Sequence, residues 1–265
     1  RPPRSTLFPY TTLFRSVVYG LGELHLRTLL DRMTETYKCE VNTPPPRIAY
    51  RETITGHAEG HHRHKKQSGG AGQFGEVFLK VEPMPRGSGF EFVDQVKGGV
   101  IPGQFIPAVE KGVRQALDAG VIAGYPVKDL RVIVYDGKAH SVDSKDIAFA
   151  TAGRKAFVDA MLKAKPIVLE PIVKIEIHAP EPAMGDITGD LSARRGQVSG
   201  TQAQPGGQIG VTGLVPLSEL SNYQARLNGL TGGQGRYSIA LSHYEAVPPT
   251  VQAQLAAQYK IKDEE

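Results

Sequence analysis

EPIVKIEIHAPEPAMGDITGDLSARRG, residues 170–196, contains the pattern that decides the fold of the C-terminal half of the chain. Apolar residues recur from Ile172 to Ile177 with the spacing of a strand that buries one face. Met184 to Arg195 has the composition of a helix. Gly196 follows it at the position that favours a left-handed backbone. The stretch therefore predicts a strand followed by a helix that packs against it.

The residues that follow complete a recognisable order of elements. Gln197–Gln202 and Gln208–Val215 are predicted to pair as a hairpin across Pro205–Gly207. A second helix is expected to begin at Pro216, and alternation from Tyr237 to Leu241 predicts a last strand. Strand, helix, two strands, helix and strand make the βαββαβ order of a ferredoxin-like domain.

The block before it, from residue 47, predicts a separate α/β domain. Its last helix has Ser144 in front of it as a candidate N-cap. A long polar loop is expected between the first two strands. The strands are predicted at Arg47–Ile54, around Val77–Val81, at Phe90–Phe92 and at Leu130–Tyr135, and the helices at Glu110–Ala119 and Lys145–Ala164.

Residues 17–46 predict only half of a domain. Apolar residues from Leu26 to Tyr37 follow helical spacing, between short strands expected at Val17–Gly20 and Cys39–Asn42. Three prolines, 44 to 46, then mark a boundary. A strand, a helix and a strand of this length do not bury a two-sided core by themselves.

Residues 1–16 are identical to a forward translation of a widely used sequencing-library adapter, and we expect them to be non-native. They hold three arginines and no acid, so without them the formal net charge falls from +4 to +1. Basic residues are concentrated instead in Arg47–Gly75, which has five Lys or Arg, four His and two Glu. Any attraction for an anionic partner is therefore expected to be local.

Several chemistries are disfavoured by the sequence. A single cysteine, Cys39, excludes an internal disulfide, and no run of eighteen apolar residues exists. Neither a nucleophile elbow nor a GxxxxGK[ST] phosphate loop occurs. Gly70–Gly75 fits GxGxxG, but a strand is predicted after it where dinucleotide binding needs a helix. His57 and His61 have a metal-compatible spacing, but no HExxH motif occurs and the segment has glycines instead of helix formers.

Two polar loops are the candidate functional segments. One carries Arg63, Lys65 and Lys66 among histidines and glycines, and the other, Asp136–Ser144, has His140 at its apex. Solvated surface is one interpretation of each loop. Contact with RNA phosphate is the other, because the cations supply charge and glycine amides permit close approach.

Five motifs in the same order resemble bacterial elongation factor G. The resemblance covers the chain from residue 17 to the C-terminal tail, and HKKQSGGAGQFG together with Leu21 is more similar to the second paralogous group of that family. The motifs are GLGELHL (Gly20–Leu26), RIAYRETI (Arg47–Ile54), HKKQSGGAGQFG (His64–Gly75), GGVIPG (Gly98–Gly103) and GDLSARRGQ (Gly189–Gln197).

The resemblance implies an α+β chain made of several domains. It implies the end of domain III at 17–46, a ribosomal-protein-like domain IV at 47–167, a ferredoxin-like domain V at 168–247, and a C-terminal helix and tail at 248–265. At the tip of domain IV it implies RNA contacts by His64, Lys65, Lys66, Gln67, Ser68, Gly69, Gly70, Gly72, Gln73, Lys138, His140 and Asp143. In domain V it implies contacts with large-subunit RNA by Arg194, Arg195 and Gln197. The other interpretation of the two arginines is an ordinary helix C-terminus, where positive charge is favourable for the helix dipole.

The resemblance also implies a role in GTP-dependent movement of tRNA and mRNA on the ribosome, in the cytoplasm. We expect this chain itself to lack GTPase activity, cofactors, metal and a membrane partner, and to be monomeric off the ribosome. Ribosome protection against tetracycline and ribosome recycling are alternative roles of the same architecture. A small-molecule kinase that uses Gly69–Gly75 as a phosphate loop is an alternative of a different class, which the predicted strand after the loop disfavours.

Overall fold

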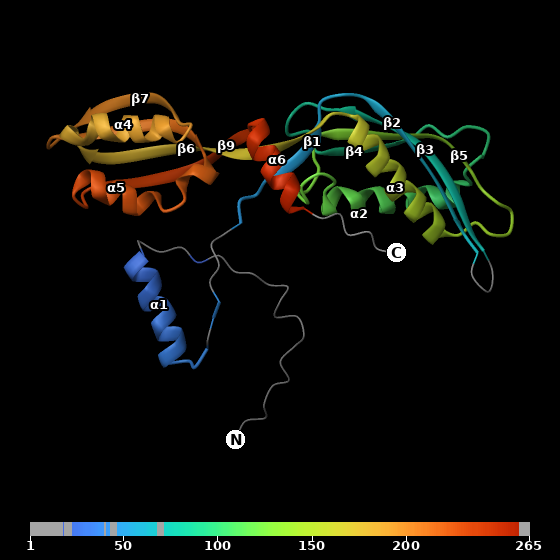
Figure 1. Cartoon of the computed structure of the whole chain (residues 1–265), viewed down its shortest axis with the longest axis horizontal. Coiled ribbons are helices and arrows are strands. Elements are labelled where there is room, and N and C mark those ends of the chain that lie inside the picture. The colour runs from blue at the N-terminus through green and yellow to red at the C-terminus, as the bar shows by residue number, and fades with distance from the viewer. Residues whose placement is uncertain (1–17, 19–22, 40, 43–46, 68–71, 260–265) are drawn as a thin grey trace, which may run out of the picture. The chain divides into compact units, whose positions relative to one another are not determined.

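The computed structural model describes residues 18, 23–39, 41–42, 47–67 and 72–259. It divides into two compact units, residues 1–47 and 48–265 (Figure 1). In the first unit the predicted helix is present as α1 (Glu23–Glu35). The strand predicted at 39–42 is wrong for the residues described there, since Cys39, Val41 and Asn42 form no strand. The strand predicted at 17–20 lies outside the described residues except for Val18, which is not in a strand.

One block of the second unit is built on a four-stranded sheet in the order β2-β3-β5-β4, in which β4 and β5 are parallel and the other pairs antiparallel. Helix α3 packs against α2 and against β2 and β3 of the sheet (Figure 1). Valine and leucine side chains of β3 and β5 form one core with both helices. The elements are β2 (Ala58–Lys66), β3 (Gln73–Pro83), β4 (Phe90–Asp94), the 3-10 turn Gly103–Phe105, α2 (Ile106–Ala119), β5 (Leu130–Lys138) and α3 (Asp146–Lys163).

The histidine-rich segment is a strand, which corrects the prediction of a long polar loop. β2 pairs with β3 over its whole length, from Ala58 opposite Val81 to Lys66 opposite Gln73. One of its residues, Gly60, allows α3 to approach, because a Cβ there would collide with the carbonyl oxygen of Ala156. The alternation that marks a half-buried strand is hidden because β2 buries a glycine where an apolar side chain is expected.

The rest of the unit has the predicted ferredoxin-like order. A five-stranded sheet has the order β1-β6-β8-β7, with β9 also paired to β6. Helices α4 and α5 pack on the strands through Ile187, Leu191 and Leu227, which join one buried cluster with Ile175 and Ile177 of β6. The elements are β1 (Arg51–Ile54), β6 (Pro166–Pro180), the 3-10 turn Glu181–Ala183, α4 (Met184–Ala193), β7 (Gln197–Gln204), β8 (Gln208–Pro216), the 3-10 turn Leu217–Leu220, α5 (Tyr223–Thr231), β9 (Arg236–Ala246) and α6 (Pro249–Gln258).

The long strand β6 connects the two blocks of the second unit. Its first four residues, Pro166–Leu169, pair with β1, and the residues after them pair with β8 and β9. The helix α6 returns to the first block, because Gln252 accepts a hydrogen bond from the Val168 amide (3.2 Å) and the Tyr259 hydroxyl donates to the carbonyl of Gly120 (3.3 Å). The boundaries predicted at 167 and 247 stay predictions.

Three local predictions about helix ends are wrong. Lys145, not Ser144, is the N-cap of α3, and no side chain caps that helix. After α4 the left-handed residue is Arg195 (φ 59°), while the Gly196 amide donates to Leu191 (2.8 Å). Pro216 is followed by a short 3-10 turn, and the helix α5 begins only after the left-handed Asn222.

Candidate nucleic-acid interface

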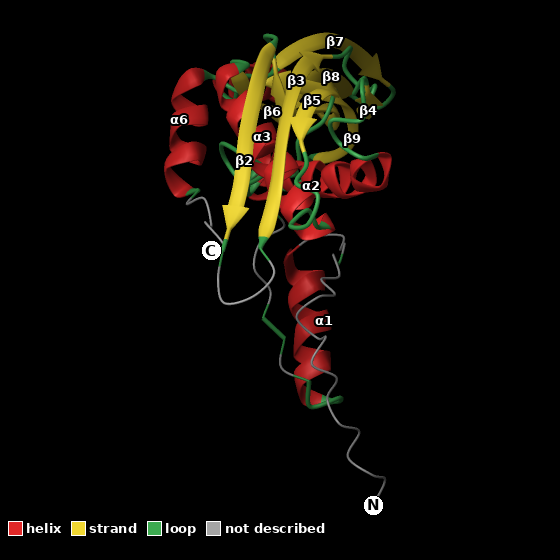
Figure 2. Cartoon of the chain, turned by 90° about the vertical axis from the view of Figure 1, so that its right-hand side faces the viewer, coloured by secondary structure: helices red, strands yellow, loops and turns green. Residues whose placement is uncertain are grey.

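The hairpin of β2 and β3 carries the first group of predicted RNA contacts. Lys65 and Lys66 are the last two residues of β2, and Gln73 is the first residue of β3. The two strands run side by side (Figure 2). His64 bonds across the hairpin through its Nε2 to the Gln73 amide oxygen (3.1 Å). Of the other predicted residues, Gln67 and Gly72 are described, whereas Ser68, Gly69 and Gly70 lie outside the described residues.

The second predicted segment, after β5, lies against this hairpin. Phe74 donates its amide to the Asp143 carbonyl (2.9 Å), and Ser144 forms an isolated parallel bridge with Phe74. A Cβ on Gly72 would lie 2.9 Å from the Asp143 carboxylate, so a side chain at that position would displace one of the two. Two segments about seventy residues apart in sequence are thereby held at one place.

The two segments enclose a hollow of about 180 Å³ at the end of the sheet. Both predicted loops contribute to it, which joins most of the described tip residues in one site. Lys138 and His64 are not among its lining residues; Lys138 lies in β5 opposite Glu76. The lining residues are Arg63, Lys65, Lys66, Gln67, Gly72, Gln73, Phe74, His140 and Asp143.

The charge of the hollow is predominantly positive. Lys65 and Lys66 are exposed, and neither forms an ion pair within the part of the chain that the structure describes. The guanidinium of Arg63 lies over the Phe74 ring at 5.2 Å. Asp143, with 30% of its side chain exposed, supplies the one carboxylate among the lining residues. Three cations beside a single carboxylate suit a phosphate backbone with its sugar hydroxyls.

His140 is held in a defined orientation. Its Nδ1 accepts the amide protons of Asp143 (3.2 Å) and Val142 (3.4 Å), and the Asp143 carboxylate lies 3.4 Å from the same nitrogen. The two amide donors favour a neutral ring with a bare Nδ1 and the proton on Nε2, whereas the nearby carboxylate favours the doubly protonated ring; Nε2 carries a proton in both forms. With 52% of the side chain exposed, the Nε2 proton is the donor that the ring offers to a partner.

Two histidines of β2, His61 and His64, bond to side chains of β3. His61 bonds to Glu76 (2.8 Å) and stacks on Phe78, with ring centroids 4.1 Å apart. Burial and the nearby Lys155 lower the pKa of His62. Among the described residues no group of three or more His, Cys, Asp or Glu side chains is arranged to hold a metal ion.

The phosphate-loop alternatives fail on the element that follows the glycines. The described end of that segment, Gly72–Gly75, runs directly into β3, which starts at Gln73 and continues to Pro83. A dinucleotide or kinase phosphate loop of this kind places the phosphate at the N-terminus of a helix. No helix begins here, so the structure offers no support for nucleotide binding at this loop.

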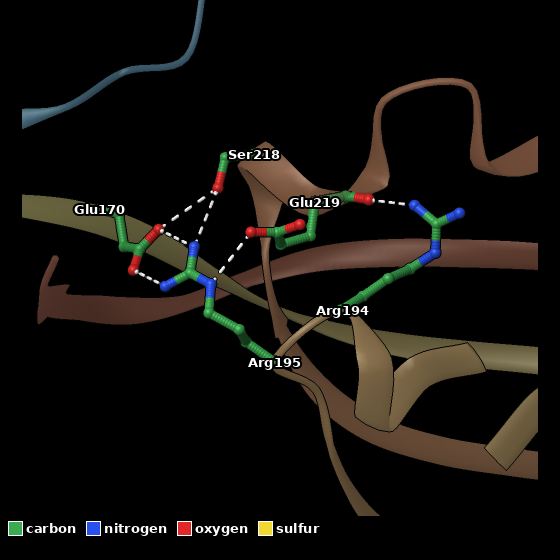
Figure 3. A network of polar contacts seen from close by, with 5 residues as sticks. All are labelled: Glu170, Arg194, Arg195, Ser218 and Glu219. Atoms are coloured by element: carbon green, nitrogen blue, oxygen red, sulfur yellow. Dashed lines mark hydrogen bonds and ion pairs between the residues drawn. The ribbon is translucent and has the colours of Figure 1, made fainter. Parts of the chain in front are cut away.

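The two arginines predicted to contact ribosomal RNA in domain V are bonded within the chain (Figure 3). Arg195 makes a bidentate ion pair with Glu170, at 2.7 and 2.9 Å, and a further one with Glu219 at 2.9 Å. Arg194 bonds Asp190 (2.8 Å) and the carbonyl of Glu219 (2.5 Å). All three guanidinium nitrogens of Arg195 are therefore bonded within the chain, whereas Nη2 of Arg194 forms no hydrogen bond among the described residues.

Gln197, the third predicted contact, is exposed at the start of β7. The contact of Arg194, Arg195 and Gln197 with RNA stays a prediction. The bonds formed by the two arginines attach the end of α4 to β6 and to the 3-10 turn Leu217–Leu220.

Two family models match the chain over almost all of its described second unit. The model for elongation factor G, domain IV, matches residues 46–165, and the model for the elongation factor G C-terminus matches residues 167–255. The chain belongs to the elongation factor G family. The hollow therefore lies in domain IV of this family and the arginine pairs lie in its C-terminal domain.

Individual relatives agree with this assignment. The elongation factor G of Aquifex pyrophilus is 48% identical over 245 residues, which are 92% of this chain and 35% of the relative. The elongation factor G-like protein of Thermotoga maritima is 46% identical over 240 residues, or 91% of this chain and 35% of the relative. A crystal structure of a protein from Thermus thermophilus superposes with a TM-score of 0.78 at 43% identity, covering 91% of this chain and 36% of that one.

The chain thus spans about a third of the length of these elongation factor G relatives. The family membership and the α+β fold were predicted correctly. Assignment to the second paralogous group stays a prediction. In the described residues no helix has the length and hydropathy needed to cross a membrane.

One buried charge in this elongation factor G chain was missed in the sequence. Glu52 of β1 is fully buried, and its two carboxylate oxygens accept four backbone amides at 2.7 to 3.1 Å, from Val121, Ile122, Ala123 and Tyr125. Its signal is a glutamate inside an otherwise strand-like stretch. Such a glutamate suggests a carboxylate with a structural role, but the sequence does not say which backbone amides it binds.

Proposed function

We propose that this chain binds the ribosome through the hollow between the β2–β3 hairpin and the loop at 139–145, which contacts RNA of the decoding site. The observation that supports the proposal is the convergence of Lys65, Lys66 and His140 on one hollow in a chain of the elongation factor G family. Lysines without an ion pair among the described residues retain their charge for phosphate oxygens. His140 supplies a positioned hydrogen-bond donor beside them.

In this proposal the whole protein uses GTP hydrolysis to move tRNA and mRNA during elongation in the cytoplasm. The chain described here acts as the arm that reaches the RNA and has no catalytic residue, cofactor or metal of its own. Ribosome protection and ribosome recycling use the same two domains, and complementation of translocation by a protein that contains this chain separates translocation from both.

Removal of the lysine charges tests the proposal. Lys65→Ala with Lys66→Ala is expected to weaken binding of the chain to ribosomes and to lower the slope of log affinity against log salt by about 1 to 2. The matched control removes two exposed lysines outside the hollow, Lys97→Ala with Lys111→Ala. Equal affinity and equal salt slope in the two double variants would overturn the assignment.

A further inference from the structure

One side-chain hydroxyl group forms hydrogen bonds with both segments that form the hollow. The Oγ of Ser144 accepts the backbone amide of His140 (2.8 Å) and donates to the backbone carbonyl of Phe74 (3.2 Å). One contact closes the loop after β5 and the other attaches that loop to the start of β3. Ser144 is not the helix cap that its position in the sequence suggests.

Backbone contacts on either side of this hydroxyl complete a small clamp. The Ser144 amide donates back to the His140 carbonyl (3.3 Å), and the Phe74 amide donates to the Asp143 carbonyl (2.9 Å). The centroid of the Phe74 ring lies 6.1 Å from that of His140, with the planes tilted by 57°. The imidazole is thus fixed through its own backbone, through Nδ1 and through a neighbouring ring.

We propose that Ser144 is a positioning residue: its hydroxyl clamps the His140 loop onto the β2–β3 hairpin and so holds the Nε2 proton of His140 ready for RNA. The inference rests on the proposed function for its RNA partner. The clamp itself does not depend on that function, because it rests on the contacts of the Ser144 hydroxyl within this chain. Loss of the hydroxyl leaves the His140 amide without its acceptor and removes one of the two hydrogen bonds that attach the loop to Phe74; the backbone bond between Phe74 and Asp143 remains.

The first measurement follows the loop itself in the full 265-residue chain. Ser144→Ala is expected to accelerate hydrogen exchange of the His140 amide about tenfold, the effect of losing one net hydrogen bond. In the same variant the ring nitrogens of His140 should lose the NMR signature of one fixed Nε2–H tautomer. Ser144→Thr keeps a hydroxyl and is expected to restore both signals. Ser141→Ala, which changes an exposed hydroxyl in the same loop, is the matched control and should behave as wild type.

The second measurement follows binding to purified ribosomes. Ser144→Ala is expected to weaken affinity about three- to tenfold, the effect of about one net hydrogen bond, with Ser144→Thr close to wild type and Ser141→Ala unchanged. Unchanged exchange and ring signals in Ser144→Ala would overturn the clamp. A loosened loop with unchanged affinity, in a protein whose Lys65 and Lys66 substitutions do weaken binding, would overturn the positioning role. If the lysine variant also binds normally, the RNA role of the hollow fails, and the exchange data still decide whether the clamp exists.

Discussion

Arg195 and Glu170 allow the sharpest test of how the C-terminal domain is held together. The Glu170 side chain is 3% exposed and that of Arg195 is 34% exposed, and they share two short hydrogen bonds. The hydrogen bonds that Arg195 donates to Glu170, and a further one to Glu219, raise the pKa of Arg195 despite the burial that opposes its charge. Arg195→Ala therefore leaves a buried carboxylate without its cation.

The size of the effect follows from these exposures. Removal of one partner of a buried ion pair costs about 3 to 5 kcal/mol, and partial solvent access to Arg195 places the expected loss near the lower end, about 3 kcal/mol. The backbone supplies a second signature, because Arg195 is left-handed with φ 59°. Glycine at that position removes a backbone strain of about 1 kcal/mol, so Arg195→Gly should be more stable than Arg195→Ala by that amount.

Urea unfolding followed by far-UV circular dichroism measures both differences, since the chain has no tryptophan. Arg236→Ala, an exposed arginine in β9, is the matched control and should stay within about 0.5 kcal/mol of wild type. The double variant Glu170→Ala/Arg195→Ala should lose much less stability than the sum of the losses in the two single variants, because it no longer buries an unpaired charge. The account of this pair would be refuted if Arg195→Ala were as stable as the control variant. It would also be refuted if the stability losses of the two single variants added up in the double variant.

Three further predictions concern stability. Tyr223 is 1% exposed, its hydroxyl has no hydrogen-bond partner among the described residues, and burial raises its pKa to about 12; Tyr223→Phe should therefore be neutral or stabilising by up to about 1 kcal/mol in urea unfolding, and a clear loss would contradict this. Burial opposes ionisation of Asp190, but hydrogen bonds from Arg194 and Arg226 hold its pKa below the ordinary value of 3.8. The ionised Asp190 therefore stabilises the folded chain above that pH, and this stabilisation is lost on further acidification. Asp190→Asn should accordingly show a weaker loss of stability between about pH 4 and pH 2. Gly60→Ala should destabilise the chain by about 1 to 3 kcal/mol through the collision with α3, whereas Gly229→Ala in α5, which has open space for a Cβ, should stabilise it by up to about 1 kcal/mol; equal effects would refute the packing argument.

The ferredoxin-like order was predictable because its signals are local. Alternation from Ile172 to Ile177 and the turn at Pro205–Gly207 each lie within one short segment, and both were confirmed. The strand β2 was not predictable in the same way, because the residue that it buries against α3 is Gly60 and most of its other residues are polar or charged. Sequence periodicity identifies a strand only when apolar side chains fill its buried positions. In β2 the close packing of α3 leaves room only for a glycine at the buried position.

The candidate site was predictable in its parts and not in its assembly. Lys65, Lys66 and His140 could be selected from charge, loop position and family resemblance. Their common hollow depends on the pairing of β3 with β5 and on the Ser144 hydroxyl, contacts between residues about seventy positions apart. The same limit applies to Arg195 and Glu170, whose basic and acidic residue types suggest surface positions until the fold pairs them.

Directed cleavage of RNA tests the central claim, that the hollow reaches the decoding site. An iron chelate attached to Ser141→Cys, in a chain whose exposed Cys39 is replaced by alanine, is expected to cleave small-subunit RNA at the decoding site when the protein is bound to ribosomes. The same chelate at Asp118→Cys, exposed at the end of α2, is the control and should not give that pattern. Cleavage at the decoding site from position 141 alone would support the account, and identical patterns from both positions, or no cleavage there from position 141, would contradict it.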